Sequence, residues 1–189
     1  IARIEHWIRT IQNDFYMPLG EIPLKAKRTM ERLDPHAVDE GGFVPVQPGY
    51  TWGEKWEYCW FAGSFRIPKE AAGERIVMDL NPGGESTLFV NGKAFGTYRA
   101  DWIARKHHYM ADNFVTDSAA AGEEFHLLME TYAGHFFPNY RNCATGPVIP
   151  GSYEDPAVEG SRRTLGTCTF GIWREDAYQL YLDMTTLYE

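Results

Sequence analysis

The sequence lacks several features that define whole classes of protein. No stretch approaches the roughly 18 consecutive apolar residues of a membrane-spanning helix. Lys and Arg number 18 against 26 Asp and Glu, so the formal net charge is −8 and no basic stripe for nucleic acid is visible. The nucleophile elbow, the P-loop and the dinucleotide-binding fingerprint are also missing. We therefore expect an acidic globular chain with no nucleic-acid or membrane partner.

Cysteine is scarce and irregularly placed. Cys59, Cys143 and Cys168 lie far apart, and no CxxC pair or finger-like Cys/His spacing occurs. A secreted disulfide framework normally has an even number of cysteines, so a reducing compartment, the cytoplasm, is the better prediction. We expect the three side chains to act as small buried hydrophobic groups.

Short alternating segments dominate the middle of the chain. Apolar residues alternate with polar ones, as in half-buried strands, and Asn91-Gly92 is a strong hairpin signal because both positions tolerate positive φ. Without helices between the strands, this pattern predicts a mainly β fold: an antiparallel β-sandwich of the galactose-binding-like jelly-roll type. The expected strands are 58–67, 76–80, 86–90, 94–98, 125–131 and 165–173.

Helical periodicity appears at the two ends. Apolar residues recur every three or four positions from Ile1 to Phe15 and again in 176–189. Between the first helix and the strands, 22–49 is expected to be an irregular wrapping segment with a short helix near 25–33. The predicted organisation is 1–49 helix and wrapping segment, 50–173 β-sandwich, and 174–189 connector helix. Because the chain begins with Ile and the last helix has no stop signal, we expect a piece of a longer polypeptide.

Metal and catalytic chemistry find little support in the pattern. His107 and His108 are adjacent, so on a strand they would point to opposite faces and would not readily share one metal ion. A glycosidase-like pair of carboxylates is conceivable, but a chain with 26 acidic residues produces such candidates by chance. We predict no metal ligand and no catalytic residue. The carboxylates considered are Asp101, Asp112, Glu130, Glu154 and Asp155.

Aromatic side chains offer a possible sugar-binding face. Trp and Tyr rings stack on the apolar face of a sugar, while acidic, amide and guanidinium groups take the hydroxyls. Asp101, Trp102 and Arg105 are the candidate carbohydrate-binding residues, with Trp52, Trp56 and Tyr109 as further members of the face. The alternative interpretation is packing, which we expect for Trp60 and Phe65 in the sandwich core.

One run of residues resembles a known family. Leu80 to Lys93 reads Gly-Gly-Glu, then a strand, then Val-Asn-Gly. This run is similar to the N-terminal β-sandwich of glycoside hydrolase family 38 α-mannosidases of the cytosolic and vacuolar type. The flanking segments 65–68, 107–108 and 130–134 agree. A similar unit occurs in the jelly-roll domains of β-galactosidase and β-glucuronidase relatives, but the long 132–161 loop and the helical exit favour the mannosidase.

The resemblance implies a supporting role for this chain. In that family the catalytic zinc and its His and Asp ligands lie in the following domain, and nothing in this sequence matches them. No cofactor is therefore expected here, with zinc only in the missing catalytic domain. The implied partners are that catalytic domain, a mannose-containing glycan, and further copies in a homo-oligomer. The 132–161 loop is expected to face the missing domain. The alternative function is a free-standing carbohydrate-binding module.

Overall fold

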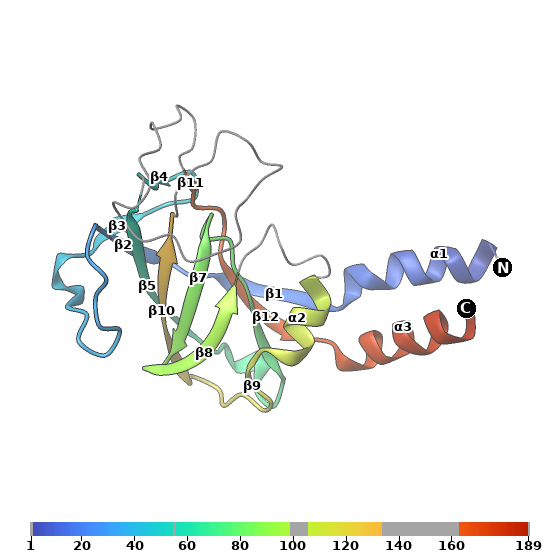
Figure 1. The fold of residues 1–189 in the computed structure, drawn as a ribbon. Helices are drawn as coiled ribbons and strands as arrows, with labels where there is room; N and C mark the ends of the chain where they lie inside the picture. The colour runs from blue at the N-terminus through green and yellow to red at the C-terminus, as the bar shows by residue number, and fades with distance from the viewer. Residues whose placement is uncertain (1, 55, 99–105, 134–162, 189) are drawn as a thin grey trace, which may run out of the picture.

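The computed structural model describes the chain except for residues 1, 55, 99–105, 134–162 and 189. The described residues form two packed antiparallel sheets (Figure 1). One sheet has the strand order β3 (Val44–Val46), β2 (Leu24–Thr29), β5 (Tyr58–Arg66), β10 (Glu124–Tyr132), β7 (Glu85–Val90) and β8 (Lys93–Tyr98). The other has the order β1 (Tyr16–Glu21), β12 (Thr169–Trp173), β6 (Ile76–Asp79) and β9 (Phe114–Thr116). A ribbon of β4 (Thr51–Trp52) and β11 (Arg163–Thr164) lies at one end. The arrangement confirms the predicted β-sandwich.

Alternation along the strands explains the two layers. In β10, Phe125, Leu127 and Met129 point into the core between the sheets, while Leu128 faces outward. The outer face is not open to water at this point, because Leu128 belongs to a second apolar cluster under the segment between β2 and β3. That cluster consists of Phe43, Trp60, Ala62, Phe89 and Leu128, with Leu33, Val38 and Tyr58 packed against it.

The predicted core residues are both buried, but on opposite faces of one sheet. Phe65 lies between the sheets, where its ring stacks on Phe170 at 4.4 Å. Trp60 has the opposite parity in β5 and belongs to the outer cluster. The hairpin signal also holds, because Asn91 and Gly92 have φ angles of 49° and 73° between β7 and β8.

The segment before residue 50 differs from its prediction. The expected helix near 25–33 is wrong, because Leu24–Thr29 is strand β2, paired with both β5 and β3. Leu24 and Ala26 are buried while Lys25 between them is exposed, so the period is two, and the charged side chains had hidden it in the sequence. With β1 in the other sheet, the sandwich begins at Tyr16 rather than near residue 50.

Helices α1 (Ala2–Thr10) and α3 (Glu175–Tyr188) lie side by side and project from the sandwich, with both ends of the chain at the far tip (Figure 1). We call them the helix pair. A short 3-10 helix, η1 (Ile11–Asp14), joins α1 to β1, so the helical run predicted to Phe15 ends at Asp14. The other short helices are η2 (Glu40–Gly42), η3 (Lys69–Ala71) and α2 (Lys106–Asp112). No helix among the described residues is both long and apolar enough to cross a membrane.

Phe15 fixes the root of the helix pair to the sandwich. Its ring is 2% exposed and contacts Trp173 at the end of β12 and Tyr178 and Tyr181 of α3, at centroid distances of 5.3 to 5.9 Å. Arg174 N–H also donates to the Phe15 carbonyl at 2.9 Å. The packed aromatic cluster therefore fixes the angle between the helix pair and the sandwich.

Candidate functional site

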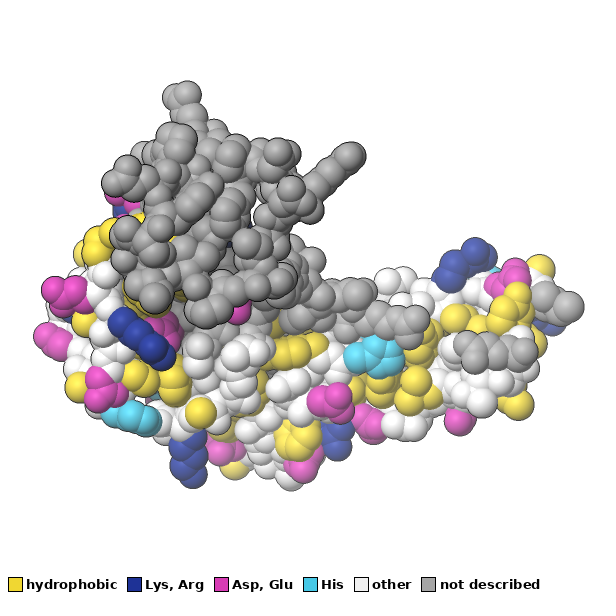
Figure 2. Space-filling model, in the orientation of Figure 1, with side chains coloured by type: hydrophobic (Ala, Val, Ile, Leu, Met, Phe, Trp, Pro, Cys, Tyr) yellow, Lys and Arg dark blue, Asp and Glu magenta, His cyan; other side chains and the backbone are white. Residues whose placement is uncertain are grey.

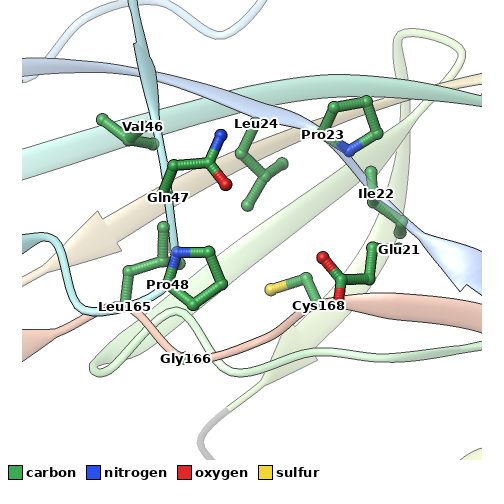
Figure 3. Close-up of a pocket in the computed structure, with 10 residues that line it drawn as sticks. All are labelled: Glu21, Ile22, Pro23, Leu24, Val46, Gln47, Pro48, Leu165, Gly166 and Cys168. Carbon is green, nitrogen blue, oxygen red and sulfur yellow. The ribbon is translucent and has the colours of Figure 1, made fainter.

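A cavity of about 280 Å³ opens at the edge of the sandwich, where the chain crosses from β1 to β2 (Figure 3). We call it the edge cavity. Three segments that are distant in sequence form it: the β1–β2 crossover, the end of β3, and the stretch leading into β12. The lining residues are Glu21, Ile22, Pro23, Leu24, Val46, Gln47, Pro48, Leu165, Gly166 and Cys168.

Backbone hydrogen bonds hold the walls of the edge cavity together. Ile22 N–H donates to the Cys168 carbonyl at 2.8 Å, which joins the crossover to the entry of β12. Gly49 N–H donates to the Leu165 carbonyl at 2.8 Å, and Leu165 N–H donates to Tyr50 at 2.9 Å. Because all three segments are tied to one another by their main chains, the cavity is preformed.

The floor of the edge cavity is apolar, and its rim carries two polar side chains beside two prolines. Ile22, Leu24, Val46 and Leu165 are at most 7% exposed, whereas the rim residues Glu21, Pro23, Gln47 and Pro48 are exposed. Figure 3 shows the Glu21 carboxylate and the Gln47 amide on opposite sides of the hollow, with Leu24 behind them. The arrangement suits reversible binding of a small molecule with an apolar face and hydroxyl groups.

Cys168 contributes a buried thiol to the floor, and this thiol reacts slowly at neutral pH. Its side chain is 3% exposed, and its Sγ accepts a hydrogen bond from Asn81 N–H at 3.2 Å. Burial raises the pKa of the Cys168 thiol to about 11, so the thiolate is scarce at neutral pH. Cys59 is also free and buried, as predicted, and burial raises its pKa too; Cys143 lies outside the described residues.

The predicted carbohydrate-binding residues Asp101, Trp102 and Arg105 lie outside the described residues, as does nearly all of the 132–161 loop. Two of the other aromatics proposed for that face, Trp52 and Tyr109, pack within the fold. Trp52 is 1% exposed and donates its Nε1–H to the Pro82 carbonyl at 3.1 Å. Tyr109 packs edge-on against Tyr98 at 5.2 Å in the main core. For these rings, packing is the correct interpretation.

The residues that line the edge cavity were not predicted from the sequence. Glu21 and Gln47 carry no motif; Gln47 lies in the stretch interpreted as irregular wrapping, and Glu21 directly precedes it. The signal available was the prolines at 23, 45 and 48, which mark edge strands and crossovers. Nothing in the sequence alone places residues 21, 47 and 168 side by side.

The two adjacent histidines occupy a helix, not a strand. His107 and His108 belong to α2, with ring centroids 4.4 Å apart, and His108 Nδ1 lies 2.6 Å from the Tyr178 hydroxyl of α3. They therefore help to join α2 to the root of the helix pair. Among the described residues, no group of three or more His, Cys, Asp or Glu side chains could hold a metal ion.

A buried carboxylate fixes the turn before β5. Glu57 is 5% exposed; its Oε2 accepts from Gly53 N–H at 2.8 Å and Glu54 N–H at 2.9 Å, and its Oε1 accepts from Arg28 Nε at 2.6 Å. Trp56, just before it, has a positive φ of 68°, a conformation that bulky residues rarely adopt. The Glu57 hydrogen bonds hold this strained turn in place, which is a structural role.

The helix pair carries an exposed apolar surface. Trp7 of α1 and Leu180 and Leu187 of α3 are 57%, 51% and 87% exposed. Together with Ile4 and Tyr188, these residues form what we call the helix-pair surface. Figure 2 shows hydrophobic side chains along the projecting helices. Patches of exposed apolar side chains commonly mark surfaces that contact another protein or domain.

Comparison with known families identifies the domain. The sequence profile described as alpha-mannosidase, jelly roll domain, matches residues 20–160, most of the chain. The chain belongs to the α-mannosidase jelly-roll domain family. This membership confirms the resemblance to the N-terminal β-sandwich of family 38 α-mannosidases. The matched range starts inside β1, which agrees with a sandwich that begins well before residue 50. No curated protein matches this jelly-roll domain.

Solved structures similar to this jelly-roll domain include glycosidases. A β-glucuronidase from Faecalibacterium prausnitzii aligns with a TM-score of 0.46 and 11% identity, covering 84% of this chain and 31% of that one. A β-glucuronidase from Ruminococcus gnavus, in complex with uronic deoxynojirimycin, aligns with a TM-score of 0.42 and 10% identity, covering 84% and 29%. This chain therefore spans less than a third of the length of these two proteins.

Proposed function

We propose that this chain is the non-catalytic N-terminal domain of an α-mannosidase and that it supports a catalytic domain in the same polypeptide. The parent enzyme would hydrolyse terminal α-linked mannose from glycans, with its zinc and its catalytic carboxylates in that other domain. Family membership supports the assignment. In this proposal the chain itself contributes no catalytic or metal-binding residue.

The observation that carries the supporting role is the helix-pair surface. α1 has no buried residue, although Ile8 packs on the aromatic cluster at its root, and α3 buries only Tyr178 and Tyr181. Trp7 of α1 and Leu180 and Leu187 of α3 are more than half exposed to water. Covering such a surface is favourable at about 25 cal/mol per Å² of apolar area. We propose that the catalytic domain covers it.

The aromatic root makes the helix pair suitable for this task. Phe15 and Trp173 fix the angle at which α1 and α3 leave the sandwich. At the tip, the Tyr188 hydroxyl donates to the Glu5 carboxylate, so the two helices are also joined at their far ends. A rigid arm positions a neighbouring domain more accurately than a flexible linker does. The same surface also suits assembly of the parent into a homo-oligomer, and the free thiols suit a cytoplasmic location.

The test uses the longer polypeptide encoded by the source gene. Trp7→Ser, Leu180→Ser and Leu187→Ser, combined, should lower α-mannosidase activity at least about tenfold or abolish assembly, because a lost apolar contact of about 1.4 kcal/mol already changes an equilibrium tenfold. Activity is measured on an aryl α-mannoside, and assembly by light scattering. Met30→Ser is the matched control, since Met30 is 60% exposed but lies away from the helix pair.

Two results would count against the proposal. If the unaltered longer polypeptide has no α-mannosidase activity, the functional assignment is wrong. If the triple variant keeps full activity and the normal oligomeric state, the helix-pair surface is not the docking surface. The edge cavity favours a second role, carbohydrate binding by the domain itself.

A further inference from the structure

The edge cavity has the features of a ligand site. None of the binding residues predicted from the sequence is among the residues that line it. It combines a preformed shape, a buried aliphatic floor and two polar groups at the rim. We propose that the edge cavity binds one sugar residue of a glycan, held between Glu21 and Gln47. The choice of a sugar among small hydroxylated molecules rests on the proposed function, that of a domain of a glycan-hydrolysing enzyme.

The two rim groups match the chemistry of neighbouring hydroxyls. The Glu21 carboxylate only accepts hydrogen bonds, whereas the Gln47 amide both donates and accepts. A hydroxyl group can do both, so one hydroxyl donates to Glu21 while another pairs with Gln47. The groups face each other across the hollow (Figure 3), which allows one ring to reach both.

The floor matches the other face of the same ring. A sugar ring presents C–H groups on one side, and Leu24, Val46 and Leu165 offer aliphatic carbon to cover them. Pro23 and Pro48 extend this apolar surface at the rim. The volume, about 280 Å³, is slightly below the roughly 300–1,000 Å³ typical of ligand pockets, which favours a single ring over a longer chain in the cavity.

Charge and composition set the class and strength of binding. The Glu21 carboxylate and the net charge of −8 disfavour an anionic sugar such as a uronic acid. None of the described residues that line the cavity is aromatic, so none of them stacks on the ring. We therefore expect a neutral sugar, bound with a dissociation constant of about 1 mM, or about −4 kcal/mol.

Cys168 provides the measurement, because its thiol lies in the floor of the edge cavity. The chain is treated with iodoacetamide at rising concentrations of methyl α-D-mannopyranoside, and the alkylation rates of Cys168 and Cys59 are read by peptide mass spectrometry. Cys59 is 0% exposed and does not line the cavity, so its rate reports opening of the sandwich. A ligand that binds only the folded chain also slows this opening, so the Cys168 rate is compared between variants and is not divided by the Cys59 rate.

At ten times the dissociation constant, the Cys168 alkylation rate should fall about tenfold. The double variant Glu21→Gln, Gln47→Ala should lose this protection, while the matched control Glu31→Gln, exposed and outside the cavity lining, should keep it. The proposal is overturned if the mannoside leaves the Cys168 rate unchanged, or if it protects the double variant equally.

This experiment is independent of the test of the supporting role. It uses the chain alone and leaves Trp7, Leu180 and Leu187 unaltered, whereas the docking experiment leaves Glu21 and Gln47 unaltered. Failure of cavity protection with a working α-mannosidase removes the sugar site only. An inactive longer polypeptide with a protected Cys168 leaves the domain as a carbohydrate-binding module.

Discussion

Two carboxylates at one end of the six-stranded sheet have opposite environments. The side-chain oxygens of Glu57, just before β5, accept three hydrogen bonds from Gly53 N–H, Glu54 N–H and Arg28 Nε. Glu130, in β10, is paired in register with Trp60 of β5. Among the described residues its buried Oε1 has no hydrogen-bond partner, and Arg32 Nε is 3.9 Å away from it. The difference shows that burying a charge stabilises a fold only where donors replace the lost water.

The consequences for stability have opposite signs. The carboxylate of Glu57 holds together a turn with a strained residue at position 56, so its removal leaves buried N–H groups unpaired. Burial raises the pKa of Glu130 above its ordinary value, and Arg32 only partly opposes this. At neutral pH the ionised Glu130 is therefore a cost to the folded state, whereas Glu57 is a support.

Glu57→Ala should produce the largest effect. Removing one partner of a buried charged network costs about 3 kcal/mol of unfolding free energy, because Gly53 N–H, Glu54 N–H and Arg28 lose their acceptor. Urea unfolding followed by fluorescence measures it. Glu54→Ala is the control: its side chain is 66% exposed and should matter by less than about 0.5 kcal/mol. Equal losses in both variants would contradict the comparison.

Much of the sandwich could be predicted from the sequence. The strands that alternate plainly, such as Ile76–Asp79 and Glu85–Val90, and the Asn91-Gly92 turn depend on local chemistry, which the sequence displays directly. Strand β2 could not be predicted in the same way. Strand β2 lies near the edge of its sheet, and its Lys and Arg side chains extend to water. Only two of its residues are buried, so the charged side chains hide the alternating pattern in the sequence.

The candidate site depends on topology rather than on motifs. Glu21, Gln47 and Cys168 come together only because β1 and β12 pair in one sheet while the chain crosses to β2 and β3 in the other. No local pattern encodes that crossover. Asp101, Trp102 and Arg105 remain predictions, since they fall outside the described residues.

Glu130→Gln should raise stability at pH 7 by about 1 kcal/mol, because a neutral amide loses less on burial than a carboxylate does. A raised folded-state pKa means that Glu130 contributes stability below its unfolded pKa of about 4.3 and loses this contribution as pH rises through the folded-state pKa. The gain of the variant over the wild type should therefore be present at pH 7 and vanish below about pH 4.

Thermal unfolding of both proteins between pH 3.5 and 7.5 measures this gain. Subtracting the two curves removes the titration of every other carboxylate, so the difference reports Glu130 alone. Glu57→Gln is the control and should be destabilised at pH 7. A Glu130→Gln variant that is less stable than the wild type at pH 7 would show that Glu130 is compensated in solution.

Arg32→Gln should give the smallest change in the free energy of unfolding. The direction of this change is the informative result. Arg32 is 81% exposed and its Nε is 3.9 Å from Glu130 Oε1, so removing it should cost no more than about 0.5 kcal/mol at pH 7. Because Arg32 lowers the pKa of Glu130, the loss should disappear below pH 4 and in the Glu130→Gln background. A double-mutant cycle across these variants measures the coupling directly. A coupling above about 1.5 kcal/mol would mean that Arg32 pairs closely with Glu130, and the contrast with Glu57 would then fail.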